Sequence, residues 1–227
     1  MLTVIPSVLP REEALALREH LLAAEWVDGN VTSGGGAALA KRNRQLPEDG
    51  EAAAHGRSVV SRALGANAQF LSAALPRRIF PPLFNRYGEA ERFGTHVDNA
   101  IRVDSASGER IRTDLSATLF LSDPDDYDGG ELVIEDEYGG REHKLAAGSM
   151  LLYPSSSLHR VTEVTRGERV SCFLWLESMV RDDGERTLLY DLDQSVQRLG
   201  SERGFDDSEV LRLTQLYHNL MRRWADA

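Results

Sequence analysis

His96 and Asp98 stand one residue apart in the mid-chain stretch RFGTHVDN. In an extended strand, side chains two positions apart point to the same side of the sheet, so this imidazole and this carboxylate would face one point. Both groups are common metal ligands. The pair alone is weak support for a metal site, because a chain with six histidines and many aspartates contains such a tripeptide by chance. A metal site would need a third ligand from a different strand.

His159, in the stretch SSSLHRV, is the third candidate ligand. It lies near the start of a predicted strand that a late hairpin could bring beside His96 and Asp98. Two histidines and one carboxylate leave three positions of an octahedral ion open, which is the arrangement of non-haem Fe(II) oxygenases. The same ligands also suit a zinc hydrolase. A third interpretation is a cupin-like binding or sensor module that holds a metal without turnover.

Arg169 follows His159 by ten residues, across the turn of HRVTEVTRGERVS, and shares strand parity with Ser171. The residues of opposite parity are apolar: Val170, Cys172, Leu174 and Leu176. An arginine that points into the protein is costly to bury without an anion, and a planar guanidinium suits a carboxylate. The need for an anion beside Arg169 favours a keto-acid cosubstrate, and therefore iron over zinc as the metal. The alternative is a surface ion pair of Arg169 with Glu163 or Glu168.

The spacing of apolar residues changes twice and divides the chain into a helical flank (1–77), a core of short alternating strands (78–178) and a helical extension (179–227). The core has eight candidate strands: IFPPLFNRY, THVDNAI, DLSATLFLS, GELVIED, REHKLAAG, SMLLYP, SLHRVTEV and ERVSCFLWLE. Short strands separated by turn sequences predict a double-sheet barrel. The expected fold class is α+β, with a double-stranded β-helix (jelly-roll) core and helices at both ends.

In the first flank, Pro10 can open one helix, and a second is expected over residues 51–75 with an interruption near Gly65. The intervening stretch SGGGAALAKRNRQLP is expected to be a flexible loop. No strand leads into its glycines and no phosphate-binding GK[ST] follows them.

In the C-terminal extension, Asp206 or Asp207 can cap a helix. The helix carries one apolar stripe, formed by Val210, Leu213, Tyr217, Leu220 and Trp224. We expect this stripe to pack on the barrel, with a homodimer interface as the alternative.

Composition limits the partners and the compartment. The formal net charge of −10 argues against nucleic acid or an anionic membrane surface as the main partner. The single cysteine, Cys172, excludes an internal disulfide and a cysteine-cluster metal site. The stretch MLTVIPSVLPREEA lacks the features of an export signal, and no run approaches 18 apolar residues. A cytoplasmic protein is expected.

The stretches around these candidates resemble one known family. HVD with a distal histidine, followed by HRVTEVTRGERVS, is similar to the prolyl 4-hydroxylase-like branch of the Fe(II)/2-oxoglutarate-dependent dioxygenases, and more closely to bacterial PKHD-type hydroxylases associated with iron uptake. Further matching stretches are FNRYGEAERFGTHVDNAIR, LSATLFLSDPDDYDGGELVIED, AAGSMLLYPSSSLHRVTEVTRGER and YDLDQSV. The resemblance covers nearly the whole chain.

The resemblance implies that His96, Asp98 and His159 ligate Fe(II). The enzyme would hydroxylate a substrate C–H bond with O2, convert 2-oxoglutarate to succinate and CO2, and use L-ascorbate to re-reduce the iron. Related halogenases replace the carboxylate with a small residue. Since Asp98 is retained, hydroxylation is expected rather than halogenation.

The resemblance also implies that Arg169 binds the distal carboxylate of 2-oxoglutarate, with Ser171 as an assistant. Tyr87, in NRYGEAERF, would hydrogen-bond the cosubstrate, although simple core packing is the alternative. Phe173 and Trp175 are expected to belong to the core rather than to a substrate platform.

The substrate is expected to be a peptidyl residue or a siderophore-like molecule of iron uptake. Both suggestions come from the resemblance alone. The polar stretch RVDSASGERIR (102–112) directly follows the candidate metal strand, and we expect it to act as a lid over the site.

Overall fold

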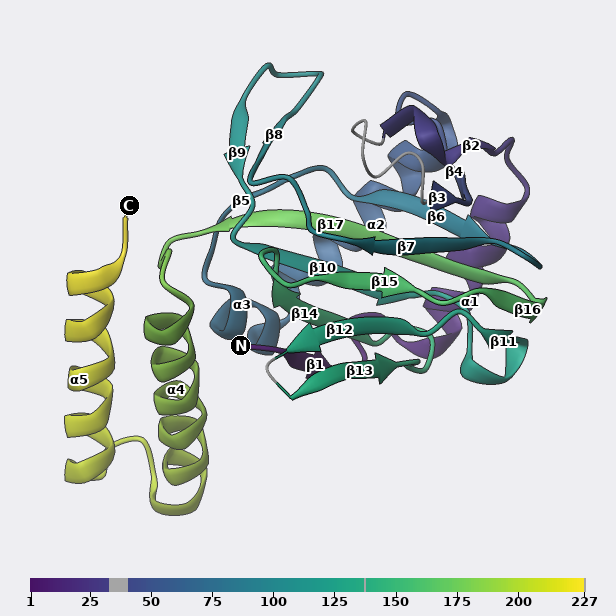
Figure 1. The fold of residues 1–227 in the computed structure, drawn as a ribbon. Coiled ribbons are helices and arrows are strands. Elements are labelled where there is room, and N and C mark those ends of the chain that lie inside the picture. Colours follow the sequence, from purple (N-terminus) through teal and green to yellow (C-terminus); the bar gives the residue numbers. More distant parts are fainter. Residues whose placement is uncertain (33–40, 137, 227) are drawn as a thin grey trace.

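The computed structural model describes residues 1–32, 41–136 and 138–226. In these residues, two antiparallel sheets face each other (Figure 1). The major sheet has eight strands, in the order β1 (Thr3–Ile5), β14 (Met150–Pro154), β10 (Leu115–Phe120), β17 (Arg169–Ser178), β6 (Leu83–Tyr87), β4 (Arg44–Gln45) and β2 (Val27–Asp28), with β5 (Pro76–Ile79) also paired to β17. The minor sheet has the order β13 (Gly139–His143), β12 (Leu132–Asp136), β15 (His159–Val161), β7 (Arg92–His96) and β3 (Lys41–Arg42). The predicted jelly-roll core is confirmed.

Alternate residues of strand β17 face two different environments, the apolar core under the helices and the cavity between the sheets. Its residues Val170, Cys172, Leu174 and Leu176 belong to the apolar cluster on the helix side of the major sheet. Arg169, Phe173 and Trp175 line the cavity between the sheets. The face assignment predicted from strand parity is therefore correct. It places a buried charge on the inner face of the barrel.

Helices α1 (Arg11–Leu22), α2 (Glu51–Ala66) and α3 (Ala68–Ala74) cover the outer face of the major sheet. Their buried apolar residues pack against strands β10, β14 and β17 in one cluster. The predicted interruption near Gly65 is present, because α2 ends at Ala66 and α3 begins at Ala68, with Asn67 between them. The Asn67 side chain accepts a hydrogen bond from the Phe70 amide and caps α3.

The first flank also contributes strands, which the helical description of residues 1–77 missed. β1 pairs with β14, β3 with β7, and β4 with β6. Residues 41–45 were expected to belong to a loop but form β3 and β4, so this part of the prediction is wrong. The glycines of that stretch lie outside the described residues. These strands are two or three residues long and owe their conformation to their partners, which no local pattern reveals.

The C-terminal extension forms a helical hairpin of α4 (Asp183–Arg203) and α5 (Ser208–Trp224) beside the sheets (Figure 1). Asp207 caps α5, as one of the two predicted candidates. The stripe expected to pack on the barrel instead packs with α4 and the segment after β17. That cluster contains Leu75, Val180, Leu189, Tyr217, Leu220 and Trp224.

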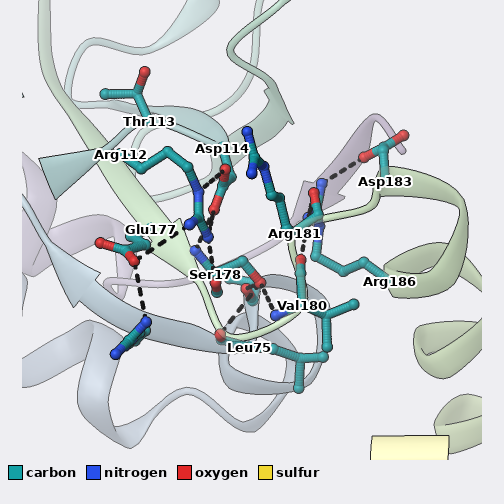
Figure 2. A network of polar contacts seen from close by, with 12 residues as sticks. Leu75, Arg112, Thr113, Asp114, Glu177, Ser178, Val180, Arg181, Asp183 and Arg186 are labelled. Atoms are coloured by element: carbon teal, nitrogen blue, oxygen red, sulfur yellow. Dashed lines mark hydrogen bonds and ion pairs between the residues drawn. The ribbon is translucent and has the colours of Figure 1, made fainter. Parts of the chain in front are cut away.

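A polar network joins this hairpin to the core (Figure 2). Arg186, 1% exposed, donates to the Val180 carbonyl at 2.7 Å and to Asp183 at 2.6 Å. Ser178 Oγ donates to the Ala74 carbonyl at 2.8 Å. These bonds hold the start of α4 against the end of β17.

The stretch expected to act as a lid forms a β-hairpin of β8 (Ile101–Val103) and β9 (Arg110–Arg112), which projects from the barrel (Figure 1). Two short pairings complete the strands: β8 with β9, and β11 (Tyr127–Gly129) with β16 (Val164–Gly167). Across the described ranges, we find no helix with the length and apolar character that a membrane span requires.

Candidate active site

The three candidate metal ligands meet at adjacent strands of the minor sheet. His96 is the last residue of β7 and His159 the first residue of β15, and the two lie opposite each other in the antiparallel register. Asp98 follows two residues after the end of β7. The late hairpin thus brings His159 beside the His-x-Asp pair, although 60 residues of chain intervene between Asp98 and His159.

The ligand atoms of these three residues all lie within 4.8 Å of one another. His159 Nε2 is 3.7 Å from Asp98 Oδ2, and the side chains are 6% and 9% exposed. The rings of His96 and His159 are 4.2 Å apart between centroids. Two imidazoles and one carboxylate thus converge on one buried point.

The hydrogen bonds of the two histidines fix which ring nitrogen is free. His96 Nδ1 lies 2.9 Å from the Gly94 carbonyl, and His159 Nδ1 lies 3.0 Å from the Ser157 carbonyl. A carbonyl can only accept, so Nδ1 donates in both rings and Nε2 keeps its lone pair. A second hydrogen bond that orients the ring is the usual support of a metal-binding histidine.

The carboxylate of Asp98 is also oriented by a neighbour. Ser116 Oγ, on β10, donates to Asp98 Oδ2 at 2.6 Å, and it lies 2.7 Å from Ser155 Oγ. The hydroxyl pair fixes one oxygen of Asp98 from the opposite sheet. Ser116 was not among the residues predicted from the sequence, although its even spacing from Thr118 on a predicted strand would have placed both on the inner face.

Burial controls the protonation of the first ligand. Desolvation, reinforced by the neighbouring His159, lowers the pKa of His96 to about 4. The ring stacks on Phe93 with centroids 3.7 Å apart. The imidazole is therefore neutral at physiological pH, which is the form that binds a metal.

Arg169 is the most unusual buried group of the barrel. It is 1% exposed, and it forms no ion pair with any residue in the described ranges. Its terminal nitrogen donates to Ser171 Oγ at 2.8 Å, while Nε is buried without a partner there. The guanidinium also lies over the rings of Tyr87 and Phe120, at 5.3 and 5.2 Å. A buried cation with an unused donor favours the binding of an anion, which would compensate the charge and accept the hydrogen bond.

The alternative of a surface ion pair for Arg169 is wrong. Glu163 pairs with Arg92, and Glu168 pairs with Arg86. Both glutamates therefore have arginine partners of their own at the edge of the hairpin, and Arg169 points inward.

Ser171 and Tyr87 lie beside Arg169 as neighbours on paired strands. Tyr87 is directly opposite Arg169 in the β6–β17 register, and Ser171 is opposite Asn85, to which its hydroxyl donates. Burial raises the pKa of Tyr87 to about 12, so its hydroxyl stays protonated and can donate a hydrogen bond.

One cavity of about 490 Å³ contains the triad and Arg169 together. Its wall also contains residues that were not predicted as site residues: Lys41, Asn85, Arg102, Thr118 and Tyr153. Burial also raises the pKa of Tyr153. Tyr153 could have been predicted from SMLLYP, because it lies two residues after Leu151, on the same face of the strand, and is the polar residue of that face. Lys41 and Arg102 come from the flank and the hairpin, where no local signal shows the direction of the side chain.

Phe173 and Trp175 combine the two roles that were treated as alternatives. Trp175 is 7% exposed and packs with Phe80, Leu83 and Ile111, and Phe173 packs against this cluster. Both rings also line the cavity. The core of this end of the barrel is therefore one wall of the site.

The residues present fit Fe(II) and 2-oxoglutarate. Two imidazole nitrogens and one carboxylate on one side are the ligand set of the two-histidine, one-carboxylate iron centres. The Nε of the buried Arg169, which has no hydrogen-bond partner in the part of the chain that the structure describes, is the feature that a dicarboxylate cosubstrate would satisfy. Fold and site together define a non-haem, 2-oxoglutarate-dependent Fe(II) oxygenase.

Comparison with known proteins supports the same class of enzyme, both through family matches and through curated relatives. Residues 82–177 match the 2OG-Fe(II) oxygenase superfamily, and residues 183–226 match the PKHD-type hydroxylase C-terminal domain. Two curated relatives are named PKHD-type hydroxylase, from Rhizorhabdus wittichii at 59% identity and Methylobacillus flagellatus at 60% identity, each over 227 residues and 100% of both chains. The chain belongs to the PKHD-type hydroxylases.

Solved structures share the fold at low sequence identity. A prolyl-4-hydroxylase from Pseudomonas putida has a TM-score of 0.55 at 20% identity, over 78% of this chain and 92% of that one. HygX from Streptomyces hygroscopicus, with nickel and 2-oxoglutarate bound, has a TM-score of 0.54 at 16% identity, over 76% and 81%. At these identities the likeness establishes the fold alone.

Proposed function

We propose that His96, Asp98 and His159 hold the Fe(II) of this dioxygenase, and that Arg169 binds the distal carboxylate of 2-oxoglutarate. The observation that carries this assignment is the burial of Arg169, with no acidic partner among the described residues, in the cavity that also holds the triad. The bound iron and cosubstrate supply the oxidising power that hydroxylates a C–H bond with O2, releasing succinate and CO2. The protein's own residues provide position and protection.

Each of the supporting residues has a definite task in this proposal. The carbonyls of Gly94 and Ser157 orient the two imidazoles, and Ser116 orients Asp98. Ser171 fixes one terminal nitrogen of Arg169. The remaining guanidinium donors are then pre-organised for a carboxylate, so little is lost in ordering them when the cosubstrate binds.

Tyr87 contributes a protonated hydroxyl near the cosubstrate carboxylate. Its register position opposite Arg169 and its raised pKa support a donor role rather than packing alone. Phe93, Phe173 and Trp175 make much of the cavity wall apolar. Such a wall restricts water around a strong oxidant.

We further infer a functional division of the chain. Residues 78–178 carry the metal and cosubstrate residues, the flank 1–77 supplies edge strands and covering helices, and the extension 179–227 forms the packed helical hairpin. The hairpin of residues 102–112 is proposed as a lid over the cavity, since Arg102 on its β8 strand lines the cavity wall.

The substrate is proposed to be a peptidyl residue or a small molecule of iron uptake. One solved structure of similar fold is a prolyl hydroxylase from Trichoplax adhaerens in complex with a peptide fragment of hypoxia inducible factor, and it supports a peptide substrate by analogy. L-Ascorbate as reductant, a cytoplasmic location and a homodimer through the C-terminal helices complete the proposal. The exposed Leu211 and Leu216 on α5 are what support a dimer.

The proposal is tested by binding, before any substrate is known. Ni(II) binding to the apo-protein is measured by calorimetry in the wild type, His96→Ala, Asp98→Ala and His159→Ala. Each triad variant is expected to lose at least about 100-fold in metal affinity, because one of only three protein ligands is gone. His143→Ala, on β13 outside the cavity lining, is the matched histidine control and should bind as the wild type does. Wild-type affinity in all three triad variants would refute the assignment.

A further inference from the structure

Strand β8 points its arginine inward and its apolar residues outward. Arg102 pairs in register with Ile111 of β9, which is 3% exposed and packs with Phe80, Leu83 and Trp175. Its neighbours Ile101 and Val103 are 52% and 57% exposed. This reverses the usual alternation, in which apolar side chains take the buried face. An arginine kept inside at the expense of two β-branched residues needs a reason.

The guanidinium of Arg102 lies over two aromatic rings, of which that of Trp175 is part of the cavity wall. Its central carbon is 3.9 Å from the centroid of Trp175 and 5.0 Å from that of Phe80. A cation–π contact holds a guanidinium in place without using its N–H donors, which stay available to another group. Trp175 thus serves as the support of Arg102.

The donors of Arg102 are not used by the part of the protein that the structure describes. Its Nε is buried without a hydrogen-bond partner there, and Arg102 forms no ion pair with a described residue. Burial lowers the pKa of Arg102, and the charges of Asp98 and Glu48 oppose that shift without coming within ion-pair distance. Arg102 is therefore held in place, but no described residue forms an ion pair that neutralises its charge.

The charge of the cavity supports an anionic ligand. If the proposed function holds, Asp98 is committed to the metal and Arg169 to the cosubstrate, which together with the iron form a nearly neutral unit. Arg102 then adds positive charge to the remaining wall. This local excess occurs in a chain with a formal net charge of −10. A cationic substrate would be repelled, and an anionic one would be attracted.

The base of the hairpin is fixed to the core, which keeps Arg102 in place. Arg112, at the end of β9, donates to both oxygens of Asp114 at 2.7 and 2.9 Å and to the Ser178 carbonyl at 3.3 Å (Figure 2). The Thr113 amide donates to the Ala100 carbonyl at 3.0 Å. A residue on a hairpin closed in this way can select a ligand, because it loses little freedom on binding.

We infer that Arg102, supported by Trp175, is a specificity-determining residue that binds a carboxylate of the substrate. This inference rests on the proposed function, because the same cavity must hold the cosubstrate. The carboxylate can belong to a small acid or to an acidic side chain of a peptide, and both present the same planar anion to the guanidinium edge.

The experiment uses matched acid and amide probes of both sources. Full-length protein saturated with Ni(II) and 2-oxoglutarate, so that Arg169 is already occupied, is titrated by calorimetry. The small-molecule pair is hippurate and hippuramide. The peptide pair is a doubly capped Ala-Glu-Ala and the same peptide with Gln. The variants are Arg102→Gln and, as control, Ile101→Gln on the outer face of the same strand.

The acid of at least one pair is expected to bind wild type and Ile101→Gln about tenfold more tightly than its amide, the factor typical of a charge-assisted contact. Arg102→Gln should bind acid and amide equally. The pair that responds identifies the source of the carboxylate. Equal binding of acids and amides by wild type, survival of the preference in Arg102→Gln, or no binding of either acid up to about 10 mM would overturn the inference.

Two further measurements distinguish a failure of this inference from a failure of the proposed function and from misfolding of the variant. Binding of Ni(II) and 2-oxoglutarate by the wild type is measured beside the probes; if the wild type fails to bind them, the proposed function fails, and the probe titrations are still read on the apo-protein. Should Arg102→Gln fold poorly by circular dichroism, Arg102→Lys replaces it. Lysine keeps the charge but loses the fork, and the acid preference should then shrink to about threefold.

Discussion

Replacing Arg169 by methionine should abolish tight 2-oxoglutarate binding while leaving the fold intact. In the wild type the guanidinium is 1% exposed, with Nε unpartnered among the described residues. Loss of one member of a buried ion pair typically costs about 3–5 kcal/mol. For a pair formed between Arg169 and the cosubstrate, this corresponds to a dissociation constant roughly 150- to 5,000-fold larger.

The stability of the apo-protein should respond in the opposite sense. Methionine has a similar volume and carries no charge whose burial costs free energy, so Arg169→Met should unfold at the same temperature as the wild type or above it. At 2-oxoglutarate concentrations about 100-fold above its dissociation constant, the wild type should gain about 2.7 kcal/mol. In a domain of this size that corresponds to a rise of about 5–10 °C in Tm. The variant should show no rise.

The assay is thermal unfolding with Ni(II) present, with and without 2-oxoglutarate, and calorimetry for the dissociation constant. Arg86→Met is the matched control, because Arg86 lies on the neighbouring strand β6, is 32% exposed and pairs with Glu168. It should bind 2-oxoglutarate as the wild type does. The reasoning is refuted if Arg169→Met binds the cosubstrate within about threefold of the wild type.

Three other outcomes follow from the geometry. Ser116→Ala removes the donor to Asp98 and should weaken Ni(II) binding about tenfold by calorimetry, and an unchanged affinity would mean that the hydroxyl does not support the ligand. Burial lowers the pKa of Lys41 from 10.5 to about 8, so between these pH values the unfolded chain holds a proton that the folded chain lacks. The stability of the folded protein therefore rises with pH across this range. Denaturant unfolding of the wild type against Lys41→Met should show this gain in the free energy of unfolding, up to roughly 3 kcal/mol, and a difference that does not change with pH contradicts it. Cys172 is fully buried and burial raises the pKa of its thiol, so a thiol reagent should label the unfolded chain only, and rapid labelling of the native protein would show that β17 opens.

Strand parity made the inner face of the barrel predictable. The period of two in ERVSCFLWLE separates Arg169 and Ser171 from Val170 and Cys172, and the same two-residue spacing puts His96 and Asp98 on one side. Only the approach of His159 needed an assumption about topology. The observed register, with His159 opposite His96, satisfies that assumption.

Features that depend on distant partners were not predictable from local pattern. The strands of the N-terminal flank are two or three residues long and form because β6, β7 and β14 offer free edges. Arg102 sits in a stretch whose composition indicates a polar loop. Its inward direction is fixed by the cluster around Trp175, which is distant in sequence. The C-terminal stripe was correctly predicted as apolar, but its packing partner was wrong, because periodicity identifies a buried face and not what covers it.

The most direct test of the central claim is an anaerobic titration of the apo-protein with Fe(II) and 2-oxoglutarate, followed by visible absorption. Chelation of 2-oxoglutarate to iron in the site should produce a weak metal-to-ligand charge-transfer band in the green region. The band should be absent in His96→Ala and should need far more 2-oxoglutarate in Arg169→Met. Bound iron without the band in the wild type, or a wild-type band in His96→Ala, would contradict the account.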